Sequence, residues 1–415
     1  MRLLYILSIH LYGLLLSLMA PFHEKARLMK KGRKNVWRRI SDRPLRGSAV
    51  VWIHCASLGE FEQGRPVIEA IKEKHPGKKI VLTFFSPSGY EIRKNYPLAD
   101  LVTYLPADTP GNAERFIDAL KPEVAIFVKY EFWPFFLNTL KKRGIPLYSI
   151  SAIFRKEQIF FRWYGRWFRN ALKAVTKFYV QDKASGEYLA SIGLNNYAVT
   201  GDTRFDRVKA IVASAKEVPE AAEFAAHASL VLVAGSTWPP DEDILARYIN
   251  QTPDGVRMII APHEVHEARI ARLEEQLEVP CFRYSRCEGG IPEGKKVMIV
   301  DTIGLLSAIY RYGHIAYIGG GFGKGIHNTL EAATYGIPVI FGPRYQKFRE
   351  ARELLATGGA FTVKDYRDFF PVAENLRTDD EFRRQMGEAA ARYVDSMCGA
   401  TRVILEEVLA HSAKS

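Results

Sequence analysis

Short apolar runs alternate with longer amphipathic stretches along the first half of the chain. The runs are rich in β-branched and aromatic residues and cover 49–54, 79–85, 123–129, 145–151 and 177–181. Stretches with apolar residues at helical spacing separate most of them, as in 64–75 and 113–120. Continuous apolar strands that alternate with helices are typical of a parallel sheet covered on both faces. The pattern therefore predicts an α/β domain.

The same alternation begins again after a polar, Ala- and Glu-rich interval at 209–228, which we interpret as a linker. The apolar runs of the second half cover 229–235, 256–262, 296–301, 314–320 and 337–342. A chain of 415 residues is also too long for one ordinary hydrophobic core. We therefore expect one α/β domain at 23–210 and another at 211–415, with a ligand-binding cleft between them.

The N-terminal residues 3–21 are apolar and carry one His but no full charge. Their number is near the lower limit for a membrane-spanning helix, about 17 residues. The following segment, 23–46, holds ten Lys and Arg residues against Glu24 and Asp42. Cationic residues after an apolar stretch hold that flank in the cytoplasm and attract anionic lipids. We expect 1–22 to be an uncleaved anchor in the inner (cytoplasmic) membrane, or a helix lying on it, with both domains on the cytoplasmic side.

Two alternatives to this membrane interpretation are disfavoured. A cleaved signal peptide would need a small-x-small cleavage site, and none is obvious after the apolar run. The formal net charge of +12 also fits a nucleic-acid-binding protein. Most of that charge, however, lies beside the apolar stretch, so we expect membrane lipids and no nucleic acid as partners. The four cysteines form no CxxC pair, which suits a reducing compartment.

The densest functional signal is "YIGGGFGKGIHNTLEAATYGIPVIFGP", residues 317–343. A strand-like run ends in three glycines, passes through Gly323 and Gly325, and reaches a predicted helix start at 328–331. Glycines let backbone approach a ligand, and a helix N-terminus attracts phosphate. The spacing matches neither a Walker A loop nor GxGxxG. We interpret the stretch as a nucleotide-phosphate site, with a structural turn as the alternative; Lys324 is either a phosphate contact or a solvated lysine.

A second signal is "VVWIHCASLGEFEQG", where an apolar strand changes into a helix at Glu60. Open α/β sheets bind ligands where strands end in this way. A carboxylate beside a helix N-terminus is favoured in its charged form and is able to act as a general base. The alternative is a simple helix-terminus charge.

Five motifs in order, "ASLGE", "KYEFWP", "TGDTRFD", "DTIGLL" and "HNTLEAATYGIPVIFGP", resemble those of the bacterial Kdo transferases. The resemblance covers roughly residues 50–343, and the apolar N-terminus also fits it. Members of this family are membrane-associated inverting glycosyltransferases of the GT-B fold, with two Rossmann-like doubly wound domains. They move 3-deoxy-D-manno-octulosonic acid (Kdo) from CMP-Kdo to the lipid A precursor. The resemblance implies the same donor and acceptor for this chain.

The resemblance also implies catalytic roles. Glu60 falls on the family's general base, and Glu131 on a glutamate that stabilises the transition state. Arg204 stands where the family commonly has Lys, which retains the charge but not the geometry. It is expected to pair with a phosphate or with the carboxylate of Kdo, or else to form a surface salt bridge.

For the donor, Pro262 and His263 align with a Pro-Arg pair that contacts CMP, so the arginine is replaced here. The other residues expected to bind CMP are Ile303, Gly304, Leu305, Asn328, Thr329, Leu330 and Glu331. Residues 241–243 are acidic but follow "WPP" and are predicted to begin a helix. We therefore expect no metal site and no cofactor, with the donor as a substrate.

One aromatic segment and two alternative functions are also considered. Residues 160–168 interleave aromatic residues with arginines, which favours a core stripe first, a membrane contact second and nucleic-acid stacking last. A sugar-nucleotide epimerase shares the two-domain architecture but needs neither a membrane segment nor an acceptor. Another membrane-associated glycosyltransferase is the second alternative.

Overall fold

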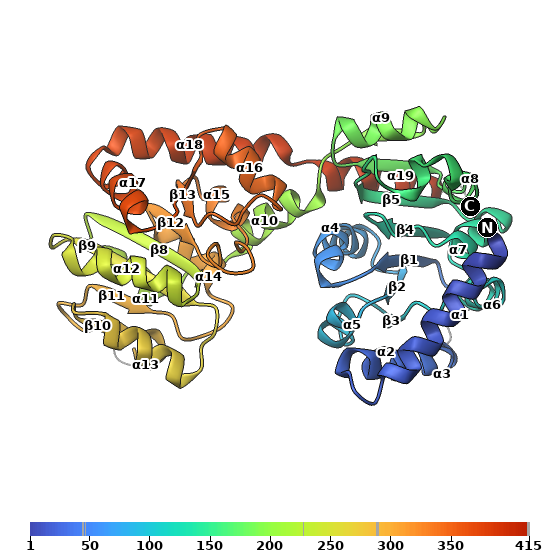
Figure 1. Ribbon diagram of the computed structural model, residues 1–415, viewed down its shortest axis with the longest axis horizontal. Coiled ribbons are helices and arrows are strands. Elements are labelled where there is room, and N and C mark those ends of the chain that lie inside the picture. Colours follow the sequence, from blue (N-terminus) through green and yellow to red (C-terminus); the bar gives the residue numbers. More distant parts are fainter. Residues whose placement is uncertain (44, 46, 227, 288–289, 413–415) are drawn as a thin grey trace. The chain divides into compact units, whose positions relative to one another are not determined.

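The computed structural model describes residues 1–43, 45, 47–226, 228–287 and 290–412. The chain divides into two compact units, one made of residues 1–207 with 398–415 and the other of 208–397 (Figure 1). Each unit is built on its own parallel sheet with helices packed against it. The α/β class predicted from the hydrophobic pattern is confirmed.

The first unit holds a sheet with strand order β3-β2-β1-β4-β5-β6-β7. Its strands are β1 (Val50–Cys55), β2 (Lys79–Phe84), β3 (Leu101–Tyr104), β4 (Val124–Val128), β5 (Leu147–Ala152), β6 (Lys177–Val180) and β7 (Tyr197–Val199). Its helices are α1 (Arg2–Met19), α2 (Glu24–Lys34), α3 (Val36–Ser41), α4 (Leu58–Lys74), α5 (Pro87–Arg93), α6 (Pro110–Leu120), α7 (Pro134–Lys142), α8 (Arg166–Leu172), α9 (Lys183–Ser191) and α19 (Ala400–Ser412). Helix α10 (Thr203–Ser214) carries the chain into the second unit.

Side-chain alternation along β1 shows why this sheet is covered on both faces. Trp52 packs its ring against Phe116 of α6 and Phe136 of α7, with ring centroids 5.1 and 5.7 Å away. Ile53 and Cys55 point the other way, toward Gly64 of α4. Successive strand residues face opposite sides of a sheet, so a strand with all its residues buried must have helices on both. Every residue of β1 is buried.

The second sheet has the order β10-β11-β9-β8-β12-β13-β14. Its strands are β8 (Leu230–Thr237), β9 (Val256–Pro262), β10 (Cys281–Arg283), β11 (Val297–Ile299), β12 (Ile315–Ile318), β13 (Val339–Phe341) and β14 (Ala360–Thr362). Its helices are α11 (Pro219–Ala226), α12 (Pro239–Gln251), α13 (Glu267–Gln276), α14 (Leu306–Ile309), α15 (Leu330–Thr334), α16 (Arg349–Ala356), α17 (Tyr366–Thr378) and α18 (Asp380–Met397). All the strand pairs of both sheets are parallel.

Two boundaries differ from those expected. The interval 209–228, interpreted as a linker, is largely helical, since α10 and α11 occupy much of it and Phe224 of α11 is buried. The last helix, α19, belongs to the first unit and not to a domain that runs to residue 415 (Figure 1, red). Its Ile404 and Val408 are buried in the first core, and its Glu407 accepts hydrogen bonds from Lys177 and Tyr179.

Helix α1 has the length and hydropathy of a membrane span, and it is the one such helix in the described residues. No side chain of α1 is buried. Tyr5, Ile6 and Leu16 form a helical stripe against the first core, while leucines cover the opposite side. Those exposed leucines are Leu3, Leu4, Leu7, Leu11, Leu14, Leu15 and Leu18. The apolar N-terminus is therefore one element of the first unit with a free apolar face.

Asp108 connects α1 to the rest of the first unit. Its carboxylate accepts a hydrogen bond from the Tyr5 hydroxyl at 2.8 Å, and from the amides of Phe135 and Phe136 at 3.2 and 3.1 Å. These amides lie in the first turn of α7, where backbone donors lack helical partners. Burial nevertheless outweighs the hydrogen bonds and raises the pKa of Asp108 to about 6.

This raised pKa predicts a pH dependence of stability. Between pH 4 and 6 the folded state binds a proton at Asp108 that the unfolded chain releases, so the free energy of unfolding decreases as the pH rises through this window. The shift from 3.8 to about 6 corresponds to about 3 kcal/mol. We expect Asp108→Asn to remove this decrease, as measured by urea denaturation at a series of pH values. An identical pH dependence in the two proteins would contradict the assignment.

Candidate active site

The strand order places two carboxylates at the same point of the first sheet. Strand β1 has β2 on one side and β4 on the other, so the connections that leave β1 and β4 diverge. Such a switch point leaves a crevice at the carboxyl ends of the strands. Glu60 follows β1 and Glu131 follows β4. The structure thus places these two predicted residues beside neighbouring strand ends.

Glu60 is held by two polar neighbours. It lies in the first turn of α4, and its side chain is buried, with 8% of the residue exposed. The Ser57 hydroxyl donates a hydrogen bond to Oε2, and the Lys129 ammonium lies 3.5 Å from Oε1. A buried carboxylate needs such partners because its transfer from water is costly. Ser57 thus contacts one oxygen of the Glu60 carboxylate and Lys129 contacts the other.

Glu131 is oriented by aromatic neighbours. Trp133 donates its indole N–H to Oε2 at 3.0 Å, and Nε2 of His54 lies 3.5 Å from the same oxygen. The other ring nitrogen of His54 is 2.9 Å from the hydroxyl of Thr83, which fixes the imidazole plane. His54 is fully buried in β1, so this network is built on the sheet itself.

The thiol of Cys55 is affected by the charges of both carboxylates, Glu60 and Glu131. Burial raises the pKa of its thiol, and the negative charges of Glu60 and Glu131 raise it further. The thiol is therefore kept protonated and packs against Gly64 of α4. Its position in the core gives it a structural role.

Arg204 is anchored by Asp202. Its Nε donates to Oδ2 of Asp202 at 3.0 Å, and the same oxygen accepts from Gln63 at 2.7 Å. Gln63 lies on α4 together with Glu60, and the hydroxyl of Thr203 donates to the Gln63 carbonyl at 2.5 Å. The start of α10 is thereby fixed to the helix that carries Glu60.

The second unit has a switch point of its own between β8 and β12, where the glycine-rich loop begins. Two of its glycines serve packing within the protein. A Cβ on Gly319 would lie 2.3 Å from the carbonyl oxygen of Ser236, and one on Gly321 would lie 2.5 Å from Gly342. Gly320 and Gly325 have φ values of 89° and 138°, which disfavour other residues.

Asp241 holds this loop in place. Its carboxylate accepts hydrogen bonds from the amide of Gly320, the amide of Trp238 and the hydroxyl of Tyr317, each at 2.9 Å. Burial raises the pKa of Asp241 against these bonds. Asp241 lies in the first turn of α12, as predicted, and its added bond to the loop could not be deduced from the helix pattern.

Two histidines stack beside the loop. The ring of His263 stacks on that of Trp238 and on that of His327, with centroids 4.8 and 4.5 Å away. Trp238 also donates its indole N–H to Nε2 of His327 at 3.2 Å. Burial lowers the pKa of His327, and His263 lowers it further. His263, which was predicted to replace an arginine that contacts CMP, thus belongs to an aromatic stack with Trp238 and His327.

The other residues predicted to bind the CMP-Kdo donor differ in exposure and in backbone conformation. Pro262 ends β9, and Ile303 is 87% exposed. Gly304 has a φ of 97°, and Leu305 precedes α14. Lys324 is exposed.

The residues at the start of α15, which follows the glycine-rich loop, hydrogen-bond to one another. Asn328 donates to Glu331 at 2.8 Å and accepts from the amide of Leu330 at 3.1 Å. Thr329 and Leu330 are buried, and the Thr329 hydroxyl has no partner among the described residues. Helix α15 has only five residues, so its dipole is short.

Several neighbours of the carboxylates were missed by sequence reasoning. Lys129, His54, Ser57 and Trp133 all touch Glu60 or Glu131. Lys129 and Trp133 flank Glu131 within the quoted "KYEFWP", which was the available signal. Among the residues that the structure describes, no group of three His, Cys, Asp or Glu side chains is placed to hold a metal.

Comparison with solved structures shows which fold the chain has. The UDP-GlcNAc 2-epimerase from Neisseria meningitidis bound to UDP-GlcNAc has a TM-score of 0.60 at 16% identity, and the comparison covers 87% of this chain and 99% of that one. The UDP-GlcNAc 2-epimerase from Methanocaldococcus jannaschii gives 0.52 at 14% identity, covering 84% and 99%. At such low identity the likeness shows the fold alone. The fold is the two-domain GT-B fold.

Sequence comparison then identifies the family. The family described as 3-deoxy-D-manno-octulosonic-acid transferase (kdotransferase) matches residues 23–207. The 3-deoxy-D-manno-octulosonic acid transferase of Aquifex aeolicus is 30% identical over 350 residues, 81% of this chain and 90% of the relative. That of Bordetella pertussis is 29% identical over 384 residues, 86% of each. The chain belongs to the Kdo transferase family, and it is a glycosyltransferase.

Lys129 offers a test of the site. We expect Lys129→Met to lower transfer at pH 7 by roughly 10-fold, less than loss of a general base, which costs 10²–10⁴-fold. The variant leaves Glu60 in place but removes the cation beside it. Steady-state kinetics, with the exposed Lys142→Met as control, measure the effect. Equal rates for the two variants would show that the ion pair has no part in the reaction.

Proposed function

We propose that this chain transfers Kdo from CMP-Kdo to a hydroxyl group of the lipid A precursor (lipid IVA) in lipopolysaccharide synthesis. Family membership supports the transferred sugar. The observation that carries the proposal is the buried Glu60 carboxylate, fixed by Ser57 and Lys129 at the end of β1. It lies within the segment that matches the family. A charged, oriented carboxylate at a strand end is suited to accept a proton.

In the proposed reaction the acceptor oxygen attacks the anomeric carbon of Kdo as the bond from that carbon to the CMP phosphate breaks. Glu60 takes the hydroxyl proton, and attack opposite the leaving group inverts the configuration. Glu131, held by Trp133, supports positive charge that develops on the sugar. Arg204, oriented by Asp202, contacts the phosphate or the carboxylate of Kdo.

The second unit is proposed to bind the donor. Pro262, His263, the 303–305 turn and the 328–331 segment take the CMP moiety, as the resemblance implies. Glu331 is suited to accept hydrogen bonds from ribose hydroxyls, while backbone amides and cationic side chains stabilise the departing CMP without a metal.

Helix α1 is proposed to lie on the inner membrane and not to cross it. One side of α1 packs on the first unit through Tyr5, Ile6 and Leu16, which leaves the leucine side for lipid. Exposed cations of α2 follow, and Trp163, 88% exposed, adds an aromatic side chain suited to the interface. Phe160 of the same aromatic segment is buried in the core. Flotation with anionic vesicles measures this docking, and binding that is unchanged after polar substitution of the leucines would contradict it.

The direct test is incubation with radiolabelled CMP-Kdo and lipid A precursor, followed by thin-layer separation. We expect label in the lipid product at an unchanged rate in EDTA, because no metal takes part in the proposed reaction. The same protein is expected to leave UDP-GlcNAc unconverted. Turnover of UDP-GlcNAc without an acceptor would favour an epimerase, and activity restored only by magnesium or manganese would overturn the metal-free mechanism.

A further inference from the structure

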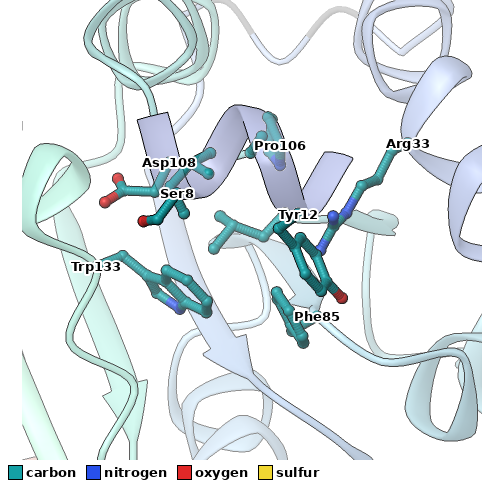
Figure 2. Close-up of a pocket in the computed structure, with 10 residues that line it drawn as sticks. Ser8, Tyr12, Arg33, Phe85, Pro106, Asp108 and Trp133 are labelled. Atoms are coloured by element: carbon teal, nitrogen blue, oxygen red, sulfur yellow. The ribbon is translucent and has the colours of Figure 1, made fainter. Parts of the chain in front are cut away.

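A cavity of about 250 Å³ lies beneath α1 in the first unit (Figure 2). Helices α1 and α2 form one wall, and the segments that follow β2, β3 and β4 form the other. The lining residues are Ser8, Ile9, Tyr12, Arg33, Phe85, Leu105, Pro106, Ala107, Asp108 and Trp133. At about 30 Å³ for each water-sized group, the space accommodates a chain of roughly eight carbon atoms.

The walls of this cavity are largely aromatic and aliphatic. The rings of Phe85 and Trp133 stack with centroids 5.0 Å apart, and Tyr12 stacks on Phe85 at 6.2 Å. The carboxylate of Asp108 is already engaged by Tyr5 and the α7 amides. Such a lining favours hydrocarbon over a polar ligand.

Arg33 is the cation at this cavity. Its guanidinium carbon lies 4.8 Å from the ring centre of Phe85 and 5.7 Å from that of Tyr12, and Figure 2 shows the side chain reaching toward these rings. Its Nε is buried and has no hydrogen-bond partner among the described residues. Burial lowers the pKa of Arg33.

The fold holds Arg33 in this inward position. The preceding residue, Gly32, brings α2 so close to Tyr104 that a Cβ would lie 2.1 Å from its ring. Other cations of α2, Lys30, Lys31 and Lys34, are exposed. A guanidinium whose Nε is buried and has no partner among the described residues is suited to a phosphate, which arginine can bind in a bidentate way.

The cavity also adjoins the candidate active site. Trp133 forms part of its wall, and the indole N–H of the same residue bonds to Glu131. On the outer side, α1 presents its exposed leucines. A lipid chain that enters beneath α1 therefore lies beside Trp133, the hydrogen-bond partner of Glu131.

Resting on the proposed function, we infer that this cavity binds one acyl chain of the acceptor and that Arg33 binds an acceptor phosphate. The ligand class is thus an acylated phosphate. The acceptor and a bulk phospholipid each carry both an acyl chain and a phosphate, whereas inorganic phosphate supplies the phosphate alone. The acceptor is the source we assign, because the wall residue Trp133 contacts Glu131.

A binding experiment tests this without Kdo transfer. Full-length protein in phosphatidylcholine nanodiscs is labelled with a diazirine-bearing alkyl phosphate, and the labelled peptides are mapped by mass spectrometry. We expect label on the peptides of α1 and of 105–108, displaced by lipid A precursor but not by phosphatidylglycerol or inorganic phosphate. Arg33→Met should reduce labelling about 10-fold, the scale of a lost charged hydrogen bond, while the exposed Arg367→Met should not. Label elsewhere, or equal displacement by phosphatidylglycerol, overturns the inference.

Kinetics distinguish this inference from the proposed function. Ala107→Trp fills the cavity, and Arg33→Met removes the cation. We expect each to lower kcat/KM for the acylated, phosphorylated acceptor about 10-fold, mainly through KM, since uniform binding is lost. For a de-acylated acceptor, Ala107→Trp should lower kcat/KM much less. Equal losses with both acceptors, or none, contradict the acyl-chain site. A wild-type protein that transfers no Kdo refutes the proposed function, while the labelling result still decides the site.

Discussion

Parallel strands bring their carboxyl ends to one edge of a sheet. Because β1 lies between β2 and β4, the residues of the candidate active site come together at that edge. The chain leaves β1 and β4 in opposite directions, and the residues that follow these two strands lie beside neighbouring strand ends. Glu60 and Glu131 are those residues. The second sheet repeats the arrangement at β8 and β12, where the glycine-rich loop begins. Each unit therefore gains its candidate site from strand order.

Burying Glu60 beside the sheet carries a cost that its neighbours offset. An isolated buried carboxylate would bind a proton or leave the interior, but the Ser57 hydroxyl and the Lys129 ammonium each meet one of its oxygens. Lys129 itself has a φ of 66°, a conformation that costs a residue with a Cβ about 1–3 kcal/mol. This strained residue is also the one whose ammonium lies 3.5 Å from Glu60, and strained backbone is common at functional sites.

The central strands could be predicted from the sequence, and the edges could not. Each of the ten apolar runs contains a strand, because a strand buried on both faces must be apolar throughout. The strands that were missed, β3, β7, β10 and β14, are the edge strands of the two sheets and have only three or four residues. The residues of α19 were predicted to lie in the second domain, because position along the chain does not say which sheet a helix packs against.

In the candidate site, too, some residues could be predicted from the sequence and others could not. Glu60 and Glu131 were found because each follows an apolar strand within a recognised motif. The pairing of Lys129 with Glu60, that of His54 with Glu131 and the cavity beneath α1 depend on contacts between distant segments, which spacing along the chain does not reveal. Arg33 was one of the ten cations counted in 23–46, and that count does not reveal the close packing of Gly32 on Tyr104 beside it.

The central claim is that Glu60 removes the acceptor proton, and the rate of Kdo transfer by Glu60→Gln tests it most directly. The amide keeps the shape of the side chain but cannot take up the proton at neutral pH. The account predicts transfer reduced by roughly 100-fold or more, with near-normal CMP binding and a stability loss of only about 0.3–1 kcal/mol from the missing helix-terminus charge. A folded Glu60→Gln protein that binds CMP and transfers Kdo at close to the parent rate would contradict the account.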